Sequence, residues 1–175
     1  FVLVSHPSIK ASNLKELIEI ARAKPKALTF GSSGVGSVPH LATEGFLQAA
    51  KISMTHTPYK GDGPAIIDLL GGHLQVFIAG PLVIANHVAT GKVRAYGVTT
   101  EKRTPVLPEL PAIAETLPGY SATTWFGTWL PLNTPQPIVT RLNRAVGNAL
   151  KAPDVQERLR ANGMEQGHGT PEAFN

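Results

Sequence analysis

Residues 27–40, ALTFGSSGVGSVPH, join an apolar run, a turn of three glycines and three serines, and the start of a helical pattern. A short apolar run that ends in glycines and leads into a helix is typical of one β–α unit in an α/β sheet. Such a turn also brings backbone N–H groups close to a bound group. The stretch predicts a strand, a helix and a binding turn. It leaves open whether the turn holds a nucleotide phosphate, a reacting oxyanion or a small anion.

Strand-like and helix-like segments alternate on both sides of this stretch. Helices of about 10–14 residues between short apolar strands predict βαβ units, and hence an α/β fold with a mainly parallel sheet flanked by helices. The expected strands cover residues 1–4, 27–30, 53–58, 74–79 and 92–99, and the expected helices cover residues 13–24, 37–50, 65–72 and, with a leading loop, 80–91.

The chain changes character after residue 100. A proline-rich loop at 100–111 precedes a short helix, a β-rich segment at 121–132 with both tryptophans, helices at 138–151 and 153–163, and a short strand at 164–169. We place a domain boundary near residues 122–126. We also interpret the chain as a piece of a longer polypeptide, because it begins on a strand and ends in what looks like the first turn of a helix.

The composition narrows the classes of function. Sixteen basic residues against twelve acidic ones give a net charge of +4, and they are dispersed, so we expect no nucleic-acid partner. No apolar run approaches the roughly 20 residues that span a bilayer. The lack of cysteine excludes disulfides and thiolate chemistry, and the six histidines lack H-x-x-x-H or H-x-H spacing, so we expect no metal site.

Three glycine-containing loops each run from the end of an expected strand to the start of an expected helix. They cover residues 29–37, 56–64 and 77–83. The carboxyl ends of parallel strands meet at one edge of a sheet, where ligands of open α/β sheets bind. Helix N-termini add roughly half a positive charge each at that edge. We therefore expect an anion site there.

The anion is not expected to be a nucleotide phosphate. A phosphate-binding P-loop needs a lysine after its last glycine, and Gly36 is followed by Ser37, Val38 and Pro39. The glycines follow G-x-x-G-x-G, the reverse of the dinucleotide fingerprint, and no acidic residue follows at the right distance. We expect no cofactor.

Catalysis is the rival interpretation of the same loop. Ser32, Ser33 or Ser37 would be the nucleophile and His40 the base, one helical turn after Ser37. The segment does not match G-x-S-x-G, and Glu44 is the only acid nearby to orient the histidine. We therefore predict no catalytic residue and expect His40 to hydrogen-bond near the helix start or to the ligand.

Several motifs, in order along the chain, resemble one known family. They are Phe30–Ser37 with His40, Leu41, Glu44 and Phe46; His56–Gly61 with Asp68–Gly72; Gly91–Thr99; Arg103–Tyr120; and Trp125–Asn143. This set is similar to the substrate-binding receptors of tripartite tricarboxylate transporters, also called Bug receptors. The resemblance runs through nearly the whole chain.

The resemblance implies a periplasmic two-lobed binding protein of the flytrap kind. Such a receptor closes on a small carboxylated solute, presents it to a membrane permease, and is not an enzyme. Residues 1–122 would be its second lobe, with a hinge strand at about residues 1–5. Residues 123–175 would be the crossover and a partial return into the first lobe. We expect a monomer.

Relatives often carry an aspartate for a ligand ammonium where this chain has Ala79, so we expect plain mono- or dicarboxylates rather than amino acids. Trp125 and Trp129 either pack between the lobes or form an apolar wall of the cleft. The predicted ligand-binding residues are Ser32, Ser33, Gly34, Gly36, Ser37, His40, Tyr59, Gly61, Ala79 and Gly80.

Two other classes of function stay open on the sequence. One is a hydrolase-like enzyme with a serine–histidine site. The other is the ligand-sensing domain of a transcription regulator, which shares the two-lobed plan.

Overall fold

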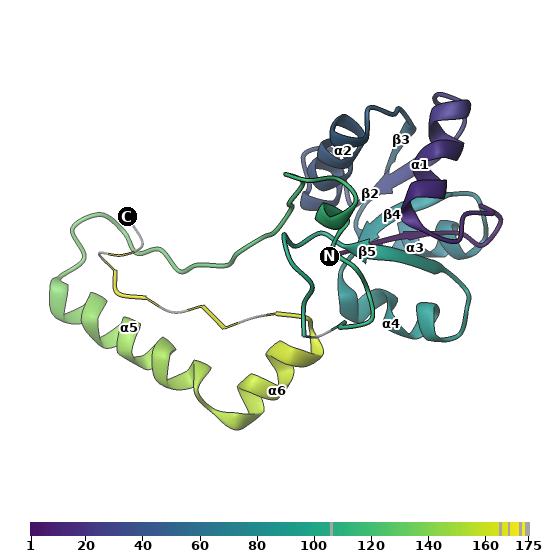
Figure 1. Ribbon diagram of the computed structural model, residues 1–175. Helices are drawn as coiled ribbons and strands as arrows, with labels where there is room; N and C mark the ends of the chain where they lie inside the picture. The colour runs from purple at the N-terminus through teal and green to yellow at the C-terminus, as the bar shows by residue number, and fades with distance from the viewer. Residues whose placement is uncertain (106, 165, 168, 172, 174–175) are drawn as a thin grey trace. The chain divides into compact units, whose positions relative to one another are not determined.

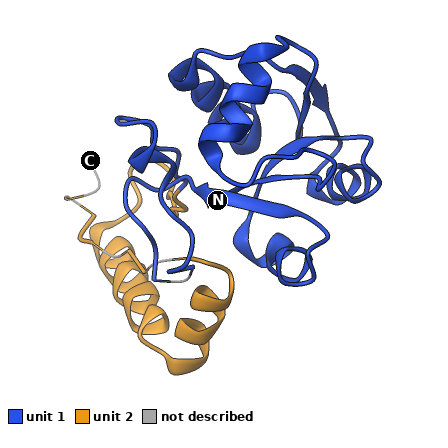
Figure 2. Cartoon of the chain, turned by 45° about the vertical axis from the view of Figure 1, so that its right-hand side comes forward, with its two compact units in different colours: residues 1–124 blue, residues 125–175 orange. Residues whose placement is uncertain are grey.

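The computed structural model describes residues 1–105, 107–164, 166–167, 169–171 and 173. The chain forms two compact units, residues 1–124 and residues 125–175, drawn in different colours in Figure 2. Each unit is described by itself. The assignment of these parts of the chain to the lobes of a two-lobed receptor stays a prediction.

The first unit is built on a five-stranded sheet with the order β3-β2-β4-β1-β5. Strand β2 pairs in parallel with β3 and β4, whereas β1 runs antiparallel to both of its neighbours, β4 and β5. The predicted α/β fold with a mainly parallel sheet is thus confirmed, with β1 as the one reversed strand. The strands are β1 (Val2–Ser5), β2 (Thr29–Ser32), β3 (Thr55–Pro58), β4 (Val76–Ala79) and β5 (Arg94–Val98).

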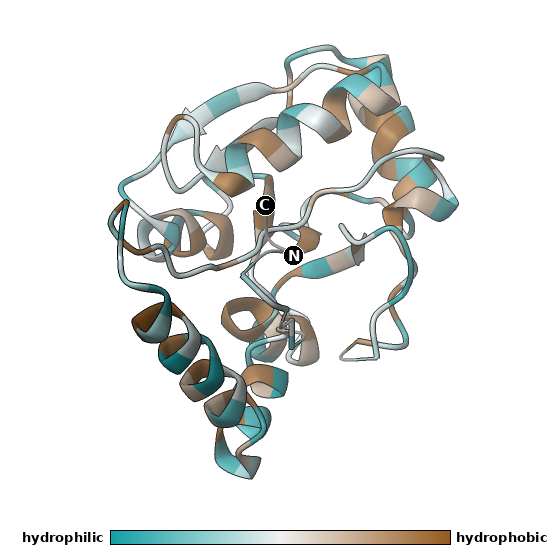
Figure 3. Cartoon of the chain, turned by 90° about the vertical axis from the view of Figure 1, so that its left-hand side faces the viewer, coloured by the Kyte–Doolittle hydropathy of each residue, from teal (hydrophilic) through white to brown (hydrophobic). Residues whose placement is uncertain are grey.

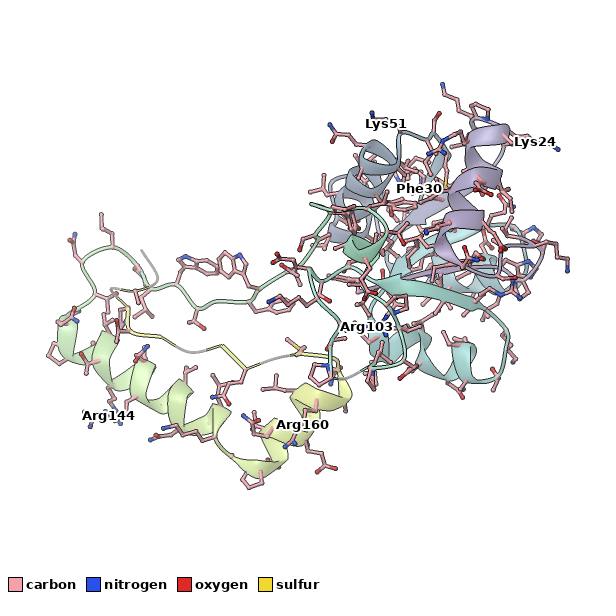
Figure 4. All side chains as sticks on the ribbon, in the orientation of Figure 1. Lys24, Phe30, Lys51, Arg103, Arg144 and Arg160 are labelled. Carbon is pink, nitrogen blue, oxygen red and sulfur yellow. The ribbon has the colours of Figure 1, made fainter. Side chains whose placement is uncertain are left out.

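Helices cover both faces of this sheet. Helices α1 (Leu14–Ala23) and α2 (Val38–Ala50) share a buried cluster with Phe30 and Ile78, whereas α3 (Asp62–Leu70) and α4 (Pro81–Ala89) share one with Phe77. Successive residues of a strand point to opposite faces, which explains why neighbours in β4 belong to different clusters. In Figure 1, α1 and α2 lie in the upper part of this unit with β3, and α4 lies at its lower edge. Figure 4 shows Phe30 among the packed side chains of this unit.

The start of α2 positions the loop that precedes it. The Ser37 hydroxyl caps the helix by accepting a hydrogen bond from the backbone N–H of His40 at 3.4 Å, and a proline stands in the first turn. Proline fits there because its missing N–H has no partner inside the helix. Helix α2 therefore begins directly where the glycine-rich turn ends.

The predicted β-rich segment at 121–132 is wrong, because these residues form no strand. Apolar and aromatic residues favour a strand only where a neighbouring strand can pair with them, and here residues 123–133 are exposed. The aromatic pair of Trp125 and Trp129 nevertheless forms, with ring centroids 5.4 Å apart. The short strand predicted at 164–169 falls partly outside the described residues, and its described residues form no strand.

The second unit contains helices α5 (Gln136–Leu150) and α6 (Pro153–Ala161). A short 3₁₀ helix, η1 (Ile113–Glu115), belongs to the first unit. Both long helices were predicted. Apolar and polar residues are interleaved along the helices (Figure 3). Three large apolar side chains of α5 are 42–48% exposed, namely those of Ile138, Leu142 and Val146. Among the described residues, no helix combines the length and the apolar character needed to cross a bilayer.

Candidate functional site

The three predicted loops leave the same edge of the sheet. Strands β2, β3 and β4 run in one direction, and each ends in a loop that leads into a helix. The loop after β2 leads to α2 on one face, and the loop after β4 leads to α4 on the other face. Neighbouring strands whose following helices diverge in this way mark a topological switch point, where open α/β sheets bind their ligands.

Two of the three loops are joined directly. The backbone N–H of Tyr59 donates to the Ser32 carbonyl at 2.9 Å, and that of Gly61 donates to the Ser33 carbonyl at 3.2 Å. The Ser33 hydroxyl donates to the carboxylate of Asp62. Within the part of the chain that the structure describes, no hydrogen bond joins the loop after β4 to either of them.

Several N–H groups of the glycine-rich turn already have acceptors inside the chain. Gly34 N–H donates to the Ser32 hydroxyl at 3.3 Å, Gly36 N–H to Nδ1 of His40 at 3.1 Å, and Ser37 N–H to the Gly34 carbonyl at 3.2 Å. The N–H groups of Ser33 and Val35 have no acceptor among the described residues. These two are therefore the donors that the turn offers to an anion.

The backbone of the turn explains its glycines. Gly34 has a φ of 136° and Gly36 a φ of 80°. Side chains are strained in this region of φ, whereas glycine adopts it freely. The two glycines fold the turn back so that the loop can be held by its own hydrogen bonds.

Ser32 is fully buried and holds the turn through His56. Its hydroxyl lies 2.7 Å from Nε2 of His56 and 3.0 Å from the Gly34 carbonyl. A hydroxyl has one proton, and a carbonyl can only accept, so the Ser32 proton goes to Gly34. His56 must then donate from Nε2, so the neutral form of this imidazole carries its proton on Nε2.

Three rings stack beneath the turn. The ring of His56 contacts both of the others, with its centroid 4.7 Å from that of Phe30 and 4.2 Å from that of His40, and the centroids of Phe30 and His40 lie 6.3 Å apart. Nδ1 of His40 accepts from Gly36, and its Nε2 lies 3.9 Å from the Glu44 carboxylate. Desolvation by burial lowers the pKa of His56, the charge of a protonated His40 lowers it further, and Glu44 opposes both. These surroundings favour the neutral imidazole of His56, and both histidine rings act as parts of the loop.

The structure places His56, and not the His40 considered for catalysis, beside one of the candidate serines, Ser32. Ser37 accepts a hydrogen bond from the His40 backbone, and it is Ser32 that contacts a histidine ring, that of His56. Ser32 is buried and its proton is already donated to a carbonyl, an arrangement that orients a loop and does not activate a nucleophile. No group of three metal-ligating side chains occurs among the described residues.

His56 is a site residue that the sequence analysis missed. The feature that reveals it is the pairing register of β2 and β3. His56 in β3 lies opposite Phe30 in β2, and hence beside the start of the turn. That register depends on which strands pair, and the sequence alone does not give it.

Tyr59 reaches the loop cluster, but its hydroxyl points elsewhere. The hydroxyl donates to the Asp68 carboxylate at 2.8 Å, and burial together with this bond raises the pKa of Tyr59 to about 12. A Cβ on Gly31 would lie 2.4 Å from Cδ2 of Leu74 and 3.3 Å from the ring of Tyr59. Gly31 therefore leaves room for a tyrosine whose hydroxyl is committed to Asp68.

The structure places Ala79 and Gly80 differently from each other. Ala79 is 0% exposed and belongs to the buried cluster shared with α3 and α4, so its side chain lies in the core. Gly80 is the N-cap residue of α4 and is partly exposed at the sheet edge. A role for either residue in ligand binding stays a prediction.

One hollow of the first unit lies along α2, and none of its lining residues belongs to the three loops. A groove of about 630 Å³ runs between α2 and residues 119–123. Its floor is fixed where the Tyr120 hydroxyl donates to the Ala42 carbonyl at 3.0 Å. The edge of the sheet gathers three strand-to-helix loops beside a topological switch point, so it remains the better candidate site.

Comparison with known proteins identifies the family. Residues 1–173 match the model of the TctC family, described as "Tripartite tricarboxylate transporter family receptor". The chain is 38% identical over 175 residues to a Pseudomonas protein described as "UPF0065 protein in tcbD-tcbE intergenic region", and 34% identical over 172 residues to Protein BugT of Bordetella pertussis. These matches include 99% and 98% of this chain and 52% and 53% of the relatives, respectively.

Solved structures give the same answer. "R. palustris Rpa4515 with adipate" has a TM-score of 0.88 and 36% identity, over 99% of this chain and 58% of that one. MatC of Rhodopseudomonas palustris, solved with bound malate, has a TM-score of 0.80 and 31% identity, over 93% of this chain and 55% of that one. The chain spans about half the length of the relatives it matches. It belongs to the TctC family of tripartite tricarboxylate transporter receptors.

Proposed function

We propose that this protein is an extracytoplasmic solute-binding receptor that captures a small carboxylated solute for a tripartite tricarboxylate transporter. The observation that carries the proposal is the joined pair of loops after β2 and β3, where the N–H groups of Ser33 and Val35 lack an acceptor within the described residues. Two structures of the family, one with adipate and one with bound malate, support a carboxylate as the ligand class.

The mechanism of capture follows from what the loops offer. A ligand carboxylate accepts the N–H groups of Ser33 and Val35, directly or through water, and gains from the dipole of α2. A hydrogen bond to a charged group contributes about 1.5–3 kcal/mol, more than one between neutral groups. A second lobe that closes over the site excludes water and strengthens these bonds.

The wider role rests on the family. The receptor acts in the periplasm, hands its ligand to a membrane permease, and works as a monomer without catalysis. The buried Ser32–His56 contact supports a binding role over a hydrolytic one, because Ser32 is inaccessible to a substrate.

Calorimetric titration of the protein with a panel of mono- and dicarboxylates tests this function, with Gly36→Ala as the informative variant. Gly36 has a φ of 80° and an open Cβ position, so alanine distorts the turn without a clash. Gly91→Ala is the matched control, since Gly91 has a φ of 68°, an equally open position and a place at the end of α4.

Both variants should lose similar stability, roughly 1–2 kcal/mol. Only Gly36→Ala should lose affinity, by at least tenfold, because it shifts the neighbouring donors. Equal affinities in the two variants would place the ligand elsewhere, and a protein that binds no carboxylate in the panel would refute the function.

A further inference from the structure

Asp62 sits where the two joined loops meet. It is the first residue of α3 and is half-buried. Its carboxylate accepts a hydrogen bond from the hydroxyl of Ser33, which belongs to the glycine-rich turn. The neighbouring Gly61 N–H donates to the Ser33 carbonyl at 3.2 Å, which holds the two residues side by side. A carboxylate of the protein is thus fixed next to the donors proposed for the ligand.

The protons available at this point decide which ligands fit. The Ser33 hydroxyl has one proton and gives it to Asp62, so it has none left for a ligand. An ionised carboxylate accepts hydrogen bonds and donates none. A ligand carboxylate that binds the N–H groups of Ser33 and Val35 therefore approaches a negative charge of the protein.

Nothing else in the described chain neutralises that charge by contact. Among the described residues, the ion pairs are His40 with Glu44 and Arg103 with Glu115, and neither involves Asp62. Lys60 lies two residues before it and is exposed. The remaining acceptor positions of Asp62 are open to a donor that the ligand brings.

We propose that Asp62 determines the ligand class and that the site selects carboxylates with a hydrogen-bond donor on the carbon next to the carboxylate, a hydroxyl or an ammonium. This inference rests on the proposed function. The ligand carboxylate binds the N–H groups of Ser33 and Val35, while its donor binds Asp62. The preference for plain carboxylates that the sequence predicts rests on Ala79, whose side chain lies in the core.

Calorimetric titration with malate, aspartate and succinate tests the inference, because the three differ only in a hydroxyl, an ammonium or neither at one carbon. The protein should bind malate or aspartate at least tenfold more tightly than succinate. Asp62→Ala should reduce that ratio of affinities below threefold, chiefly by lowering the affinity for the ligand that carries the donor. Asp62→Asn keeps an acceptor oxygen without the charge, so it should retain a preference for malate and lose one for aspartate.

Asp154→Asn is the matched control, because Asp154 also lies in the first turn of a helix, α6, outside the loops. It should leave all three affinities within twofold. Thermal melting of each variant checks folding, and Asp62→Asn carries the test if Asp62→Ala does not fold. Succinate bound as tightly as the other two, or a ratio unchanged in folded Asp62 variants, overturns the role of Asp62 and leaves carboxylate capture standing. Failure to bind any of the three, or any other carboxylate, refutes the proposed function itself.

Discussion

Replacement of Ala79 by aspartate should destabilise the first unit rather than retune its ligand preference. Ala79 ends β4, pairs with Val2 across the antiparallel ladder, and is 0% exposed. The cluster around it is apolar and includes Phe77 and Ile84. A carboxylate placed there has no partner, and an unpaired buried charge costs several kcal/mol.

The size of the effect follows from two terms. Overpacking of a closed core costs about 1–3 kcal/mol, and burial of the charge, relieved in part by protonation, adds about 2–3 kcal/mol more. A loss of roughly 3–6 kcal/mol is a large share of the 5–15 kcal/mol that stabilises a typical domain. At a few degrees for each kcal/mol, the melting temperature should fall by roughly 10–20 °C.

Thermal and urea unfolding of three variants separate these terms. Ala79→Asn adds the same volume without the charge, and Ala85→Asp introduces the same carboxylate at an exposed position of α4. We expect Ala79→Asp to be the least stable, Ala79→Asn intermediate and Ala85→Asp close to the wild type. Burial raises the pKa of the introduced carboxyl, so its deficit should shrink as the pH falls toward 4. A fully stable Ala79→Asp that loses carboxylate affinity would refute this reasoning and make Ala79 a ligand contact.

Three further predictions concern the loop cluster. The pKa of His56 is lower in the folded protein than in the unfolded chain, so the unfolded state binds more protons and the free energy of unfolding should fall as the pH drops below about 6.5. Urea unfolding from pH 8 to 5 measures this fall, and the dependence of the unfolding free energy on pH should be weaker in His56→Gln. Gly31→Ala should lose about 1–3 kcal/mol because its Cβ meets Leu74, whereas Gly63→Ala, where the Cβ position is open, should not, and equal unfolding midpoints would contradict the packing described. Tyr59→Phe should lose up to about 1.5 kcal/mol and change ligand affinity less than threefold, because the hydroxyl is bound to Asp68; a larger loss of affinity would mean that this hydroxyl contacts the ligand.

The sequence predicted the order of elements in the first unit well. Helices expected at 13–24 and 37–50 match α1 and α2 to within a residue at each end, since apolar periodicity and caps are local signals. The β-rich segment predicted at 121–132 was wrong because strand formation, unlike helix formation, depends on a distant partner. A strand exists only by pairing, and its apolar and aromatic composition carries no information about a partner.

The candidate site was predictable in its location but not in its contacts. Strand-to-helix loops with glycines locate the edge of the sheet, and the structure joins two of them there. The contacts of the site depend on side-chain geometry between different parts of the chain. They are the hydrogen bond from the Ser33 hydroxyl to Asp62, the ring contact of His40 with His56, and the hydrogen bond from the Tyr59 hydroxyl to Asp68. No spacing within the sequence encodes such contacts.

The reversed strand β1 has a consequence for how the chain is made. It precedes the other four strands of this sheet, yet it lies inside the sheet between β4 and β5, and Val2 pairs with both Ala79 and Val98. Translation at about 5–20 residues per second leaves β1 without either neighbour for several seconds after it emerges from the ribosome. Pairings between such distant segments also slow folding in general. The apolar segment Val2–Val4 therefore stays without its strand partners until β4 has been made.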